Sequence, residues 1–355
     1  MTNRTSFQTP KSTAVKFARR LSLAVFLGMC AYVTTSRAAS ETIADGNAAP
    51  SAQPSSASAR FPENAVEFDQ LFEEIKNWGR WGPQDQLGAL NLITPAKRKQ
   101  AIALARLGQV VSLAHPLLTE GSEENGKPFE FTMNEGLMTD TYKFNYHGFL
   151  LTHLDALCHF PYKGKDYNGY PTETVNTPKG CAKLGVENLR NGIVTRGILI
   201  DIPRLKHVPY LEPGEPVFVE DLEAWEKQTH LKVSPGDAIF LRTGRWTRWA
   251  KVGPWSLVHG AAGFHPSVAR WLKQRGVAVM GSDIGELMPS PVDGVFGPTH
   301  ILAINALGIV LLDNHDLEAL AETAARLKRW EFMLTVAPLP VTGGTGSPVN
   351  SLAIF

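Results

Sequence analysis

The sequence predicts a mixed α/β domain. Several apolar runs rich in Val, Ile and Leu, bounded by Gly, Pro or Asp, have the length and composition of buried strands. Helical patterns lie between some of these runs, and strands and helices alternate late in the chain. Because 43% of the 355 residues are hydrophobic and 19% are charged, the chain can bury the large core that such a fold requires.

Residues 1–38 are typical of an export signal. Basic residues, among them Arg19 and Arg20, precede the apolar run LSLAVFLGMCAYV, which is short for a bilayer span. Ser36 and Ala38 supply small residues for cleavage after Ala38. We expect a periplasmic or secreted protein without stable membrane association after signal removal. A buried N-terminal helix or an uncleaved anchor is the alternative.

A flexible linker is expected at residues 39–60, which are small, polar and proline-bearing. Residues 61–355 have the composition of a folded body without a second linker or an internal repeat, so we expect one domain there. The formal net charge of +1 provides no strong field to gather a polyanion, so we expect no nucleic-acid partner.

The strands are expected to be buried and short. In chain order they are QVVSL (109–113), GIVTRGILIDI (192–202), DAIFLRT (237–243), VAVMGSD (277–283), GIVLLDN (308–314) and FMLTVAPL (332–339).

Three helices are expected, one before the first of these strands and two between later ones. The segment 94–108 opens with a threonine N-cap and a proline at the first helical position, and it ends at a glycine. The segment 265–276 repeats this pattern with a histidine as the N-cap, and the third helix, 316–329, follows the strand at 308–314.

The segment YHGFLLTHLDALCHF, residues 146–160, places three histidines and one aspartate in an apolar run. In a strand, His147, His153, Asp155 and His159 would share one face, whereas in a helix the middle two would point nearly opposite ways. A strand is therefore the regular structure in which the middle two act together. Because six residues of strand span about 20 Å, either outer histidine joins them only if the chain bends.

A bound divalent metal would explain these polar groups. An unpaired buried carboxylate costs several kcal/mol or shifts its pKa. Neutral imidazole and carboxylate oxygens are ligands for zinc, manganese or iron, so an ion removes that cost. The alternative is a structural His–Asp network in the core.

The segment HGFLLTHLDALCH resembles the metal signature of the cyclase family, His-x-Gly-Thr-His-x-Asp-x-x-x-His, a family that includes bacterial kynurenine formamidase and isatin hydrolase. Further blocks resemble its larger members, so that the resemblance covers residues 61–355: WGRWGPQDQLGALNLI (78–93), GDAIFLRTGRW (236–246), GVAVMGSD (276–283), PTHILAINALGIVLLDNHDLE (298–318) and TGSPVN (345–350). The resemblance implies a mixed barrel-like sheet with flanking helices, of the swivelling β/β/α type, and a homo-oligomer, either dimer or tetramer.

The resemblance also implies roles for particular residues. His153 and Asp155 match metal ligands, and His159 matches a general base or acid. His300 matches a downstream histidine ligand of the two-zinc formamidases. Asp313 matches a position where those enzymes carry a bridging glutamate, although aspartate reaches one methylene less. The implied cofactor is a divalent metal, Zn or Mn, with one or two ions.

The sequence departs from the family signature at one ligand position. The first histidine of the signature falls at Phe149, and His147 lies two residues earlier, on the same face of an expected strand. Either His147 takes over the role through a bulge, or the metal has one protein ligand fewer. We keep His147 among the candidate metal ligands.

The candidate metal ligands and a histidine that can move a proton suit metal-dependent hydrolysis of an amide, imide, lactone or ester bond in a small cyclic or aromatic substrate. A metal lowers the pKa of bound water from about 15.7 toward 7 and polarises a carbonyl group, and a nearby histidine can move a proton. The alternatives are a cyclase or lyase on the same site, and an exported metal-binding protein without catalysis.

Other polar residues have a functional and a structural interpretation. His259 and His265 either line the pocket or belong to a loop and a helix cap. Asp283 and Glu286 follow a strand end, where they either contact or orient a ligand or cap the strand. Arg242 binds either a substrate carboxylate or a buried acid.

The cysteines leave one question open. Cys158 and Cys181 remain after signal removal, and two cysteines are no disulfide framework, although one bridge between them is possible in an oxidising compartment.

Overall fold

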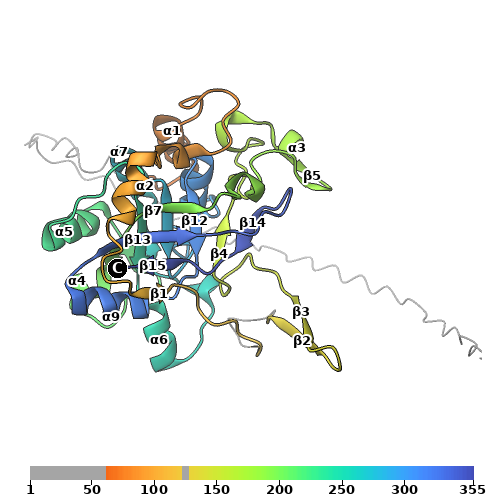
Figure 1. The fold of residues 1–355 in the computed structure, drawn as a ribbon. Helices are drawn as coiled ribbons and strands as arrows, with labels where there is room; N and C mark the ends of the chain where they lie inside the picture. The colour runs from red at the N-terminus through yellow and green to blue at the C-terminus, as the bar shows by residue number, and fades with distance from the viewer. Residues whose placement is uncertain (1–60, 122–127) are drawn as a thin grey trace, which may run out of the picture. The chain divides into compact units, whose positions relative to one another are not determined.

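One mixed sheet of nine strands forms the centre of the described protein (Figure 1). The computed structural model describes residues 61–121 and 128–355, so the expected signal at 1–38 and linker at 39–60 lie outside the described residues. In spatial order the strands are β1 (Val110–Ser112), β15 (Leu352–Ile354), β13 (Glu331–Val336), β7 (Ile193–Asp201), β9 (Ala238–Arg242), β11 (Val279–Ser282), β12 (Val310–Asp313), β4 (His153–Asp155) and β14 (Gly346–Pro348).

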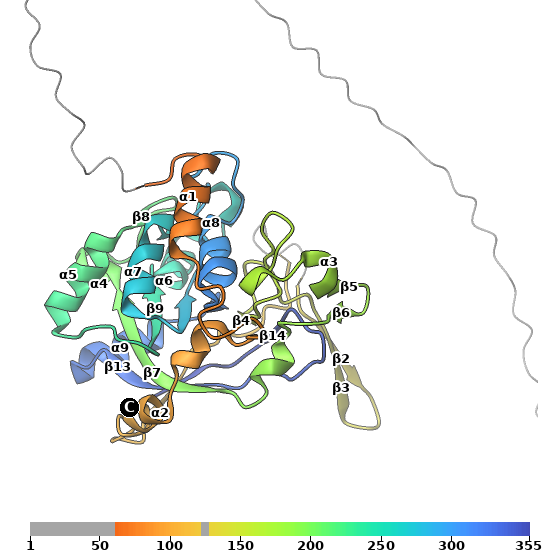
Figure 2. The same cartoon turned by 90° about the horizontal axis from the view of Figure 1, so that it is seen from above.

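The middle of the sheet is parallel and its flanks are antiparallel. β7, β9, β11 and β12 run in one direction, and every residue of β9 is buried. Strands that are covered on both faces need continuous apolar sequence, which is why these segments are runs of Val, Ile and Leu. β13, β15 and β1 on one side, and β4 and β14 on the other, add antiparallel pairs. The sheet curls into a half-barrel (Figure 2), which confirms the expected fold class.

Helices flank this sheet. The longer ones are α1 (Ala65–Ile75), α2 (Pro95–Ile102), α5 (Val219–Thr229), α6 (Arg245–Val252), α7 (Ala269–Arg275) and α9 (Glu318–Leu327). Within the described ranges, no helix combines the length and the apolar character needed to cross a bilayer.

The first predicted helix, 94–108, is shorter than expected. It begins as predicted, because the Thr94 side chain accepts a hydrogen bond from the Lys97 backbone N–H at 3.2 Å. It ends at Ile102, and the Leu107 backbone N–H donates instead to Phe355 at 2.9 Å. Pairing with the C-terminal segment therefore replaces the last turns of the predicted helix.

The other two predicted helices form with changed starts. Within 265–276, a 3₁₀ turn, η6 (Pro266–Val268), precedes α7, and Gly276 ends the helix with a φ of 66°. In the third, α9 occupies the middle of 316–329.

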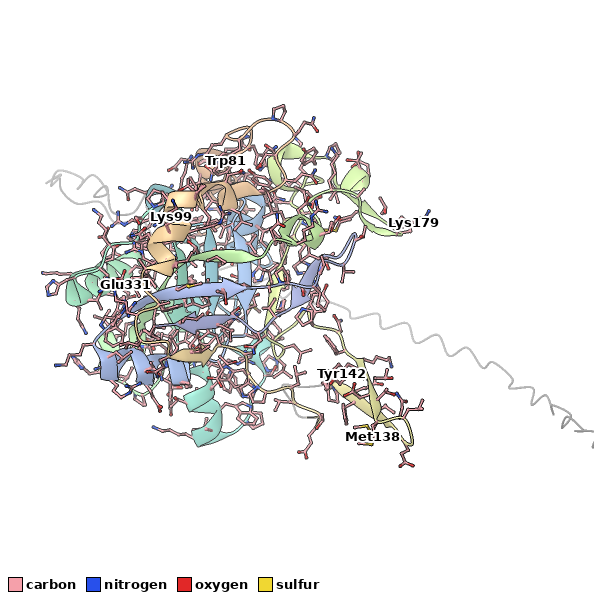
Figure 3. The ribbon with its side chains drawn as sticks, viewed as in Figure 1. Trp81, Lys99, Met138, Tyr142, Lys179 and Glu331 are labelled. Carbon is pink, nitrogen blue, oxygen red and sulfur yellow. A yellow bond between two sulfur atoms is a disulfide. The ribbon has the colours of Figure 1, made fainter. Side chains whose placement is uncertain are left out.

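A two-stranded hairpin lies outside the main sheet and was not predicted. β2 (Glu130–Asn134) pairs with β3 (Thr139–Lys143), and every residue of both strands is exposed. Apolar side chains are among them, including Phe131 and Tyr142, while Met138 lies at the turn (Figure 3).

The short strand β4 places distant parts of the chain beside one another. His153 lies opposite Asp313 of β12 on one side and Pro348 of β14 on the other, and Asp155 lies opposite Gly346. A Cβ at Gly346 would stand 2.2 Å from the Leu154 carbonyl oxygen, so only glycine allows β14 this approach.

Candidate metal centre

Strand β4 aims His153 and Asp155 to one side of the sheet. Both side chains are buried, and Leu154 between them packs in the core. The strand expected from alternation is confirmed only over these three residues. It does not reach the outer histidines, because the chain bends after His147, at Gly148 with a φ of 135°, and turns again before His159.

The bends bring four imidazoles around one carboxylate. To Asp155 Oδ1, the distances are 3.0 Å from His147 Nδ1 and 3.4 Å from His153 Nε2. To Asp155 Oδ2, they are 3.8 Å from His159 Nε2 and 3.7 Å from His300 Nε2. All four sequence-predicted histidines therefore converge on Asp155.

His300 and Asp313 complete this cluster from two other elements. His300 ends the short helix α8 (Pro298–His300), Asp313 ends β12, and His300 Nε2 lies 3.0 Å from Asp313 Oδ2. A Cβ at Gly285 would stand 2.5 Å from Asp313 Oδ2, so the absence of a side chain there leaves room for the carboxylate.

Hydrogen bonds fix which ring nitrogen of three histidines faces Asp155. His153 donates from Nδ1 to the Leu151 carbonyl oxygen at 2.7 Å, and His300 donates from Nδ1 to Glu286 at 2.8 Å. Both rings therefore present Nε2 to the cluster. His147 is reversed, because its Nε2 lies 2.8 Å from the Thr345 hydroxyl oxygen. Orientation of an imidazole through its second nitrogen is usual at metal sites in proteins.

Several buried atoms of the cluster lack hydrogen-bond partners among the described residues. They are both carboxylate oxygens of Asp155 and Nδ1 of His147. In two groups of residues, the potential ligand atoms lie within 4.8 Å of one another and could hold a metal ion. The groups are His147, His153 and Asp155, and Asp155, His300 and Asp313. Since the orphaned atoms are a carboxylate and an imidazole nitrogen, their chemistry fits a divalent cation.

The site also shifts the pKa values of its members in the absence of a cation. Burial opposes the charged form of Asp155, but the His153 and His147 imidazoles outweigh it and hold the pKa of that carboxyl well below its usual range. Burial lowers the pKa of His300, and the nearby Asp313 and Glu286 carboxylates more than reverse this, so that pKa is raised. For His159, burial dominates and lowers the pKa to about 4.

Comparison with known proteins identifies the family of this chain. The Cyclase family model, described as "Putative cyclase", matches residues 93–287. A crystal structure described as that of a novel cyclase is 30% identical and covers 80% of this chain and 99% of its own, with a TM-score of 0.73. The chain belongs to the cyclase family. No curated protein matches it with significance.

Two isatin hydrolase structures show the same fold at lower identity. Isatin hydrolase A from Ralstonia solanacearum is 22% identical, covers 73% of this chain and 97% of its own, and has a TM-score of 0.50. An isatin hydrolase bound to the product analogue thioisatinate is 19% identical, covers 74% of this chain and 99% of its own, and also has a TM-score of 0.50. The isatin hydrolases thus share the fold of this chain.

In this cyclase-family chain, His147 lies in the cluster and Phe149 does not. Phe149 instead lines the cavity beside the cluster, and its carbonyl oxygen accepts a hydrogen bond from the buried Arg245. His147 stacks on His159 with ring centroids 3.8 Å apart and an angle of 8° between the planes. The longer connection between His147 and His153 therefore bends so that the earlier histidine reaches Asp155.

A cavity of about 150 Å³ opens beside the cluster. One wall is polar and includes His159, His300 and Asp313. The remaining side chains are largely apolar, and no Lys or Arg of the described residues lines the cavity; the apolar ones are Phe149, Phe160, Met288 and Phe296.

The other candidate residues have structural contacts. Asp283 accepts hydrogen bonds from the backbone N–H groups of residues 243–245, which matches strand-end capping, and burial raises its pKa to about 6. Arg242 pairs with Asp201 and Glu318, and His265 accepts from the Ser267 N–H. None of these three side chains lines the cavity.

Glu286 orients the His300 ring. Its carboxylate accepts hydrogen bonds from the backbone N–H groups of Thr299 and His300 and from the His300 ring. The sequence offered orientation of a ligand as one interpretation of this residue. Thr345, Phe160 and Phe296 were not predicted, and only the position of Thr345 within the TGSPVN block singled it out in the sequence.

Proposed function

We propose that this protein is a metal-dependent hydrolase that cleaves an amide, imide, lactone or ester bond in a small cyclic or aromatic substrate. The observation that carries the proposal is Asp155: both of its oxygens are buried without a hydrogen-bond partner in the described chain, inside a ring of four imidazoles. A divalent cation satisfies this arrangement, whereas a purely structural network would need protonated histidines to pair with the carboxylate.

The proposed metal ligands fall into two sets that share Asp155. His147, His153 and Asp155 would hold one ion, and Asp155, His300 and Asp313 a second. We propose Zn or Mn, because both accept mixed nitrogen and oxygen ligands. When bound, such an ion supplies hydroxide near neutral pH and polarises a carbonyl group.

His159 is the proposed proton carrier. Its ring borders the cavity, and a pKa of about 4 keeps the imidazole neutral at pH 7, so that it can accept a proton. It takes a proton from the attacking water and returns it to the leaving nitrogen or oxygen. Glu286 keeps His300 oriented, and Phe149 and Phe160 limit access of water to the reacting atoms.

The walls of the cavity support an uncharged ring as the substrate. A volume of about 150 Å³ is that of a cavity known to hold one benzene ring in another protein. Since no Lys or Arg of the described residues lines it, no ammonium or guanidinium group there would pair with a substrate carboxylate. The shared fold of the isatin hydrolases supports a cyclic amide as one such substrate.

Elemental analysis combined with a hydrolysis panel tests this proposal. We expect purified wild type to carry Zn or Mn and to hydrolyse at least one neutral aryl amide, cyclic imide, lactone or ester, and His153→Ala to lose both properties. Incorporation of ¹⁸O from labelled water into product distinguishes hydrolysis from a lyase reaction. Equal metal content in wild type and His153→Ala would overturn the proposed ligand set.

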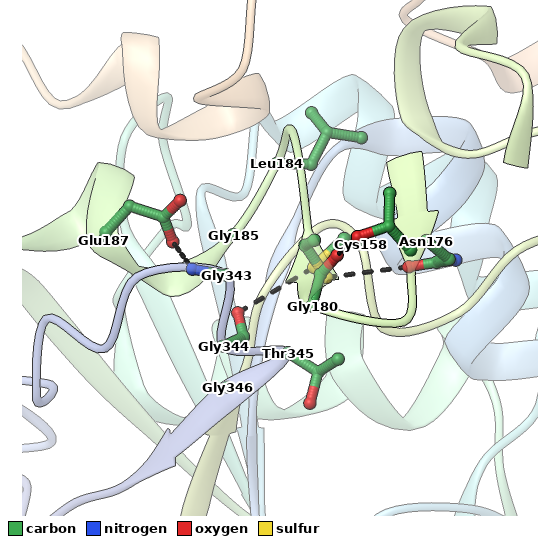
Figure 4. The surroundings of a disulfide bond; sticks show 12 residues. Cys158, Asn176, Gly180, Leu184, Gly185, Glu187, Gly343, Gly344, Thr345 and Gly346 are labelled. Atoms are coloured by element: carbon green, nitrogen blue, oxygen red, sulfur yellow. Dashed lines mark hydrogen bonds between the residues drawn. A yellow bond between two sulfur atoms is a disulfide. The ribbon is translucent and has the colours of Figure 1, made fainter. Parts of the chain in front are cut away.

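We also propose that the protein is exported to the periplasm or secreted. The support is the N-terminal sequence together with a disulfide between Cys158 and Cys181, since disulfides persist in oxidising compartments (Figure 4). Fractionation of cells that express the full chain, with N-terminal sequencing of the product, tests this. Export with cleavage after Ala38 is expected, and an intact cytoplasmic protein would contradict it.

A further inference from the structure

We propose that Thr345 is a positioning residue that turns Nδ1 of His147 toward Asp155. The inference rests on the proposed function, because it concerns the orientation of a proposed metal ligand. Thr345 touches His147 rather than the cavity, since its hydroxyl oxygen lies 2.8 Å from His147 Nε2.

His147 needs such a partner because no regular element holds it. It precedes the bend at Gly148, and its side chain is 22% exposed. Stacking on His159 fixes the plane of the ring, but a flipped ring would stack equally well. The flip decides whether Nδ1 or a ring carbon faces Asp155. A hydrogen bond between Nε2 and the Thr345 hydroxyl selects the orientation in which Nδ1 lies 3.0 Å from Asp155 Oδ1.

The position of Nδ1 is a second observation. It is buried, and it lies 3.0 Å from the carboxylate that both proposed ions would share. When Nε2 carries the proton and donates to the Thr345 hydroxyl, the lone pair of Nδ1 is available to a cation.

The backbone around Thr345 is held firmly against the site. The Thr345 carbonyl oxygen accepts from the Ala156 N–H at 2.9 Å, and the Gly346 carbonyl oxygen accepts from the Tyr146 hydroxyl at 3.0 Å. Residues 146 and 147 thus meet residues 345 and 346 through two hydrogen bonds between side chains and this turn.

A disulfide anchors the same turn from its other side. Cys158 Sγ lies 3.9 Å from the Gly344 carbonyl oxygen, and the Cys181 N–H donates to the Gly343 carbonyl oxygen at 2.9 Å. Figure 4 shows Gly343, Gly344 and Thr345 beside the bridge. The hydroxyl of Thr345 is therefore presented by a turn that is fixed at both ends, as a positioning group must be.

Four variants separate the hydroxyl group from the bulk of the side chain. Thr345→Val removes the hydroxyl at constant shape, Thr345→Ala removes it with little added strain, and Thr345→Ser retains it. Thr342→Val changes an exposed threonine in the same loop and is the matched control.

The first readout is the orientation of the His147 ring in metal-free protein labelled with ¹³C,¹⁵N-histidine at pH 8, assigned with His147→Gln. Because Cε1 of His147 faces Gly346, a nuclear Overhauser effect from Hε1 to the Gly346 Hα protons is expected in wild type, Thr345→Ser and Thr342→Val. In Thr345→Val and Thr345→Ala this signal is weakened, because the flipped ring is populated. The same signal in all of them would overturn the inference.

The second readout is Zn²⁺ affinity, measured by competition with a chromophoric chelator. Removal of a partner that orients a metal-binding histidine typically costs 10–100-fold in affinity, so that loss is expected for Thr345→Val and Thr345→Ala. Thr345→Ser is expected to stay within about threefold of wild type. Wild-type affinity in both hydroxyl-free variants would overturn the inference. A wild type that binds no Zn²⁺ would overturn the proposed function and leave the ring-orientation measurement to decide on Thr345.

Discussion

Single residues determine the chemistry of this site, and His159 is the one that separates binding from catalysis. Its Nε2 stands 3.8 Å from Asp155 Oδ2, and it belongs to neither group of donor atoms that could hold an ion. We predict that His159→Gln lowers kcat by about 10²–10⁴-fold, because proton transfer is lost, while metal content is unchanged. Steady-state kinetics with elemental analysis measures both. Loss of metal in this variant would make His159 a ligand instead.

The raised pKa of a second residue, Asp166, makes the free energy of unfolding depend on pH. Its side chain is buried. Burial raises the pKa of Asp166 to about 6, and the Thr172 hydroxyl offsets only part of this. Because the folded pKa exceeds the unfolded value of 3.8, the stability from this group is complete below pH 3.8 and is lost as pH rises through 6.

Asp166→Asn is therefore predicted to stabilise the protein at pH 8, by about 1 kcal/mol after allowance for solvent screening, or about 2 °C in Tm. The gain should vanish near pH 4, where the wild-type carboxyl is largely protonated. Thermal unfolding of both proteins at the two pH values measures this. A less stable variant at pH 8 would mean that the carboxylate has a favourable partner.

Residue spacing predicted part of the site and could not predict the rest. His153 and Asp155 share a strand face through simple alternation, so local sequence contains that information. Glu286 and Thr345 lie more than 100 residues after β4 in the sequence, and their contacts with His300 and His147 depend on tertiary structure. Phe296 belongs to a loop without any periodic pattern.

At the scale of elements, the Cys158–Cys181 disulfide ties the turn that carries His159 to the β6 strand (Gly180–Cys181). A bridge across 23 residues constrains the unfolded chain, so we predict that Cys158→Ser/Cys181→Ser lowers the free energy of unfolding by about 3 kcal/mol. Urea unfolding under non-reducing conditions measures the difference. Under dithiothreitol, wild type should approach the double variant. Equal stability of the two proteins without reductant would show that the bridge contributes nothing.

Buried parallel strands were predictable, whereas short edge elements were not. Apart from their last residues, Arg242 and Asp313, β9 and β12 are apolar because both faces are covered, and this leaves a continuous signal in the sequence. β14 has only three residues and contains glycine and proline, so its pairing with β4 comes from tertiary structure. The hairpin of β2 and β3 has no buried face that would produce alternation.

At the scale of the whole molecule, we propose a homo-oligomer, as the resemblance to the family implies. The β2–β3 hairpin supports this, because Leu137 and Met138 at its turn are 78% and 84% exposed, and isolated two-stranded hairpins are marginal in water. Light scattering after size exclusion is predicted to give a dimer or tetramer. The double substitution Leu137→Glu/Met138→Glu should shift the oligomeric state toward monomer. A monomeric wild type would contradict the proposal.

The central claim is that Asp155 and its surrounding imidazoles bind a divalent cation, and anomalous diffraction from crystals of the Zn²⁺-loaded protein tests it most directly. We predict an anomalous peak about 2.0–2.2 Å from an Asp155 carboxylate oxygen and at a similar distance from His153 Nε2. Crystals that contain zinc elsewhere, with the Asp155 carboxylate hydrogen bonded to protonated histidines and no peak beside it, would contradict the claim.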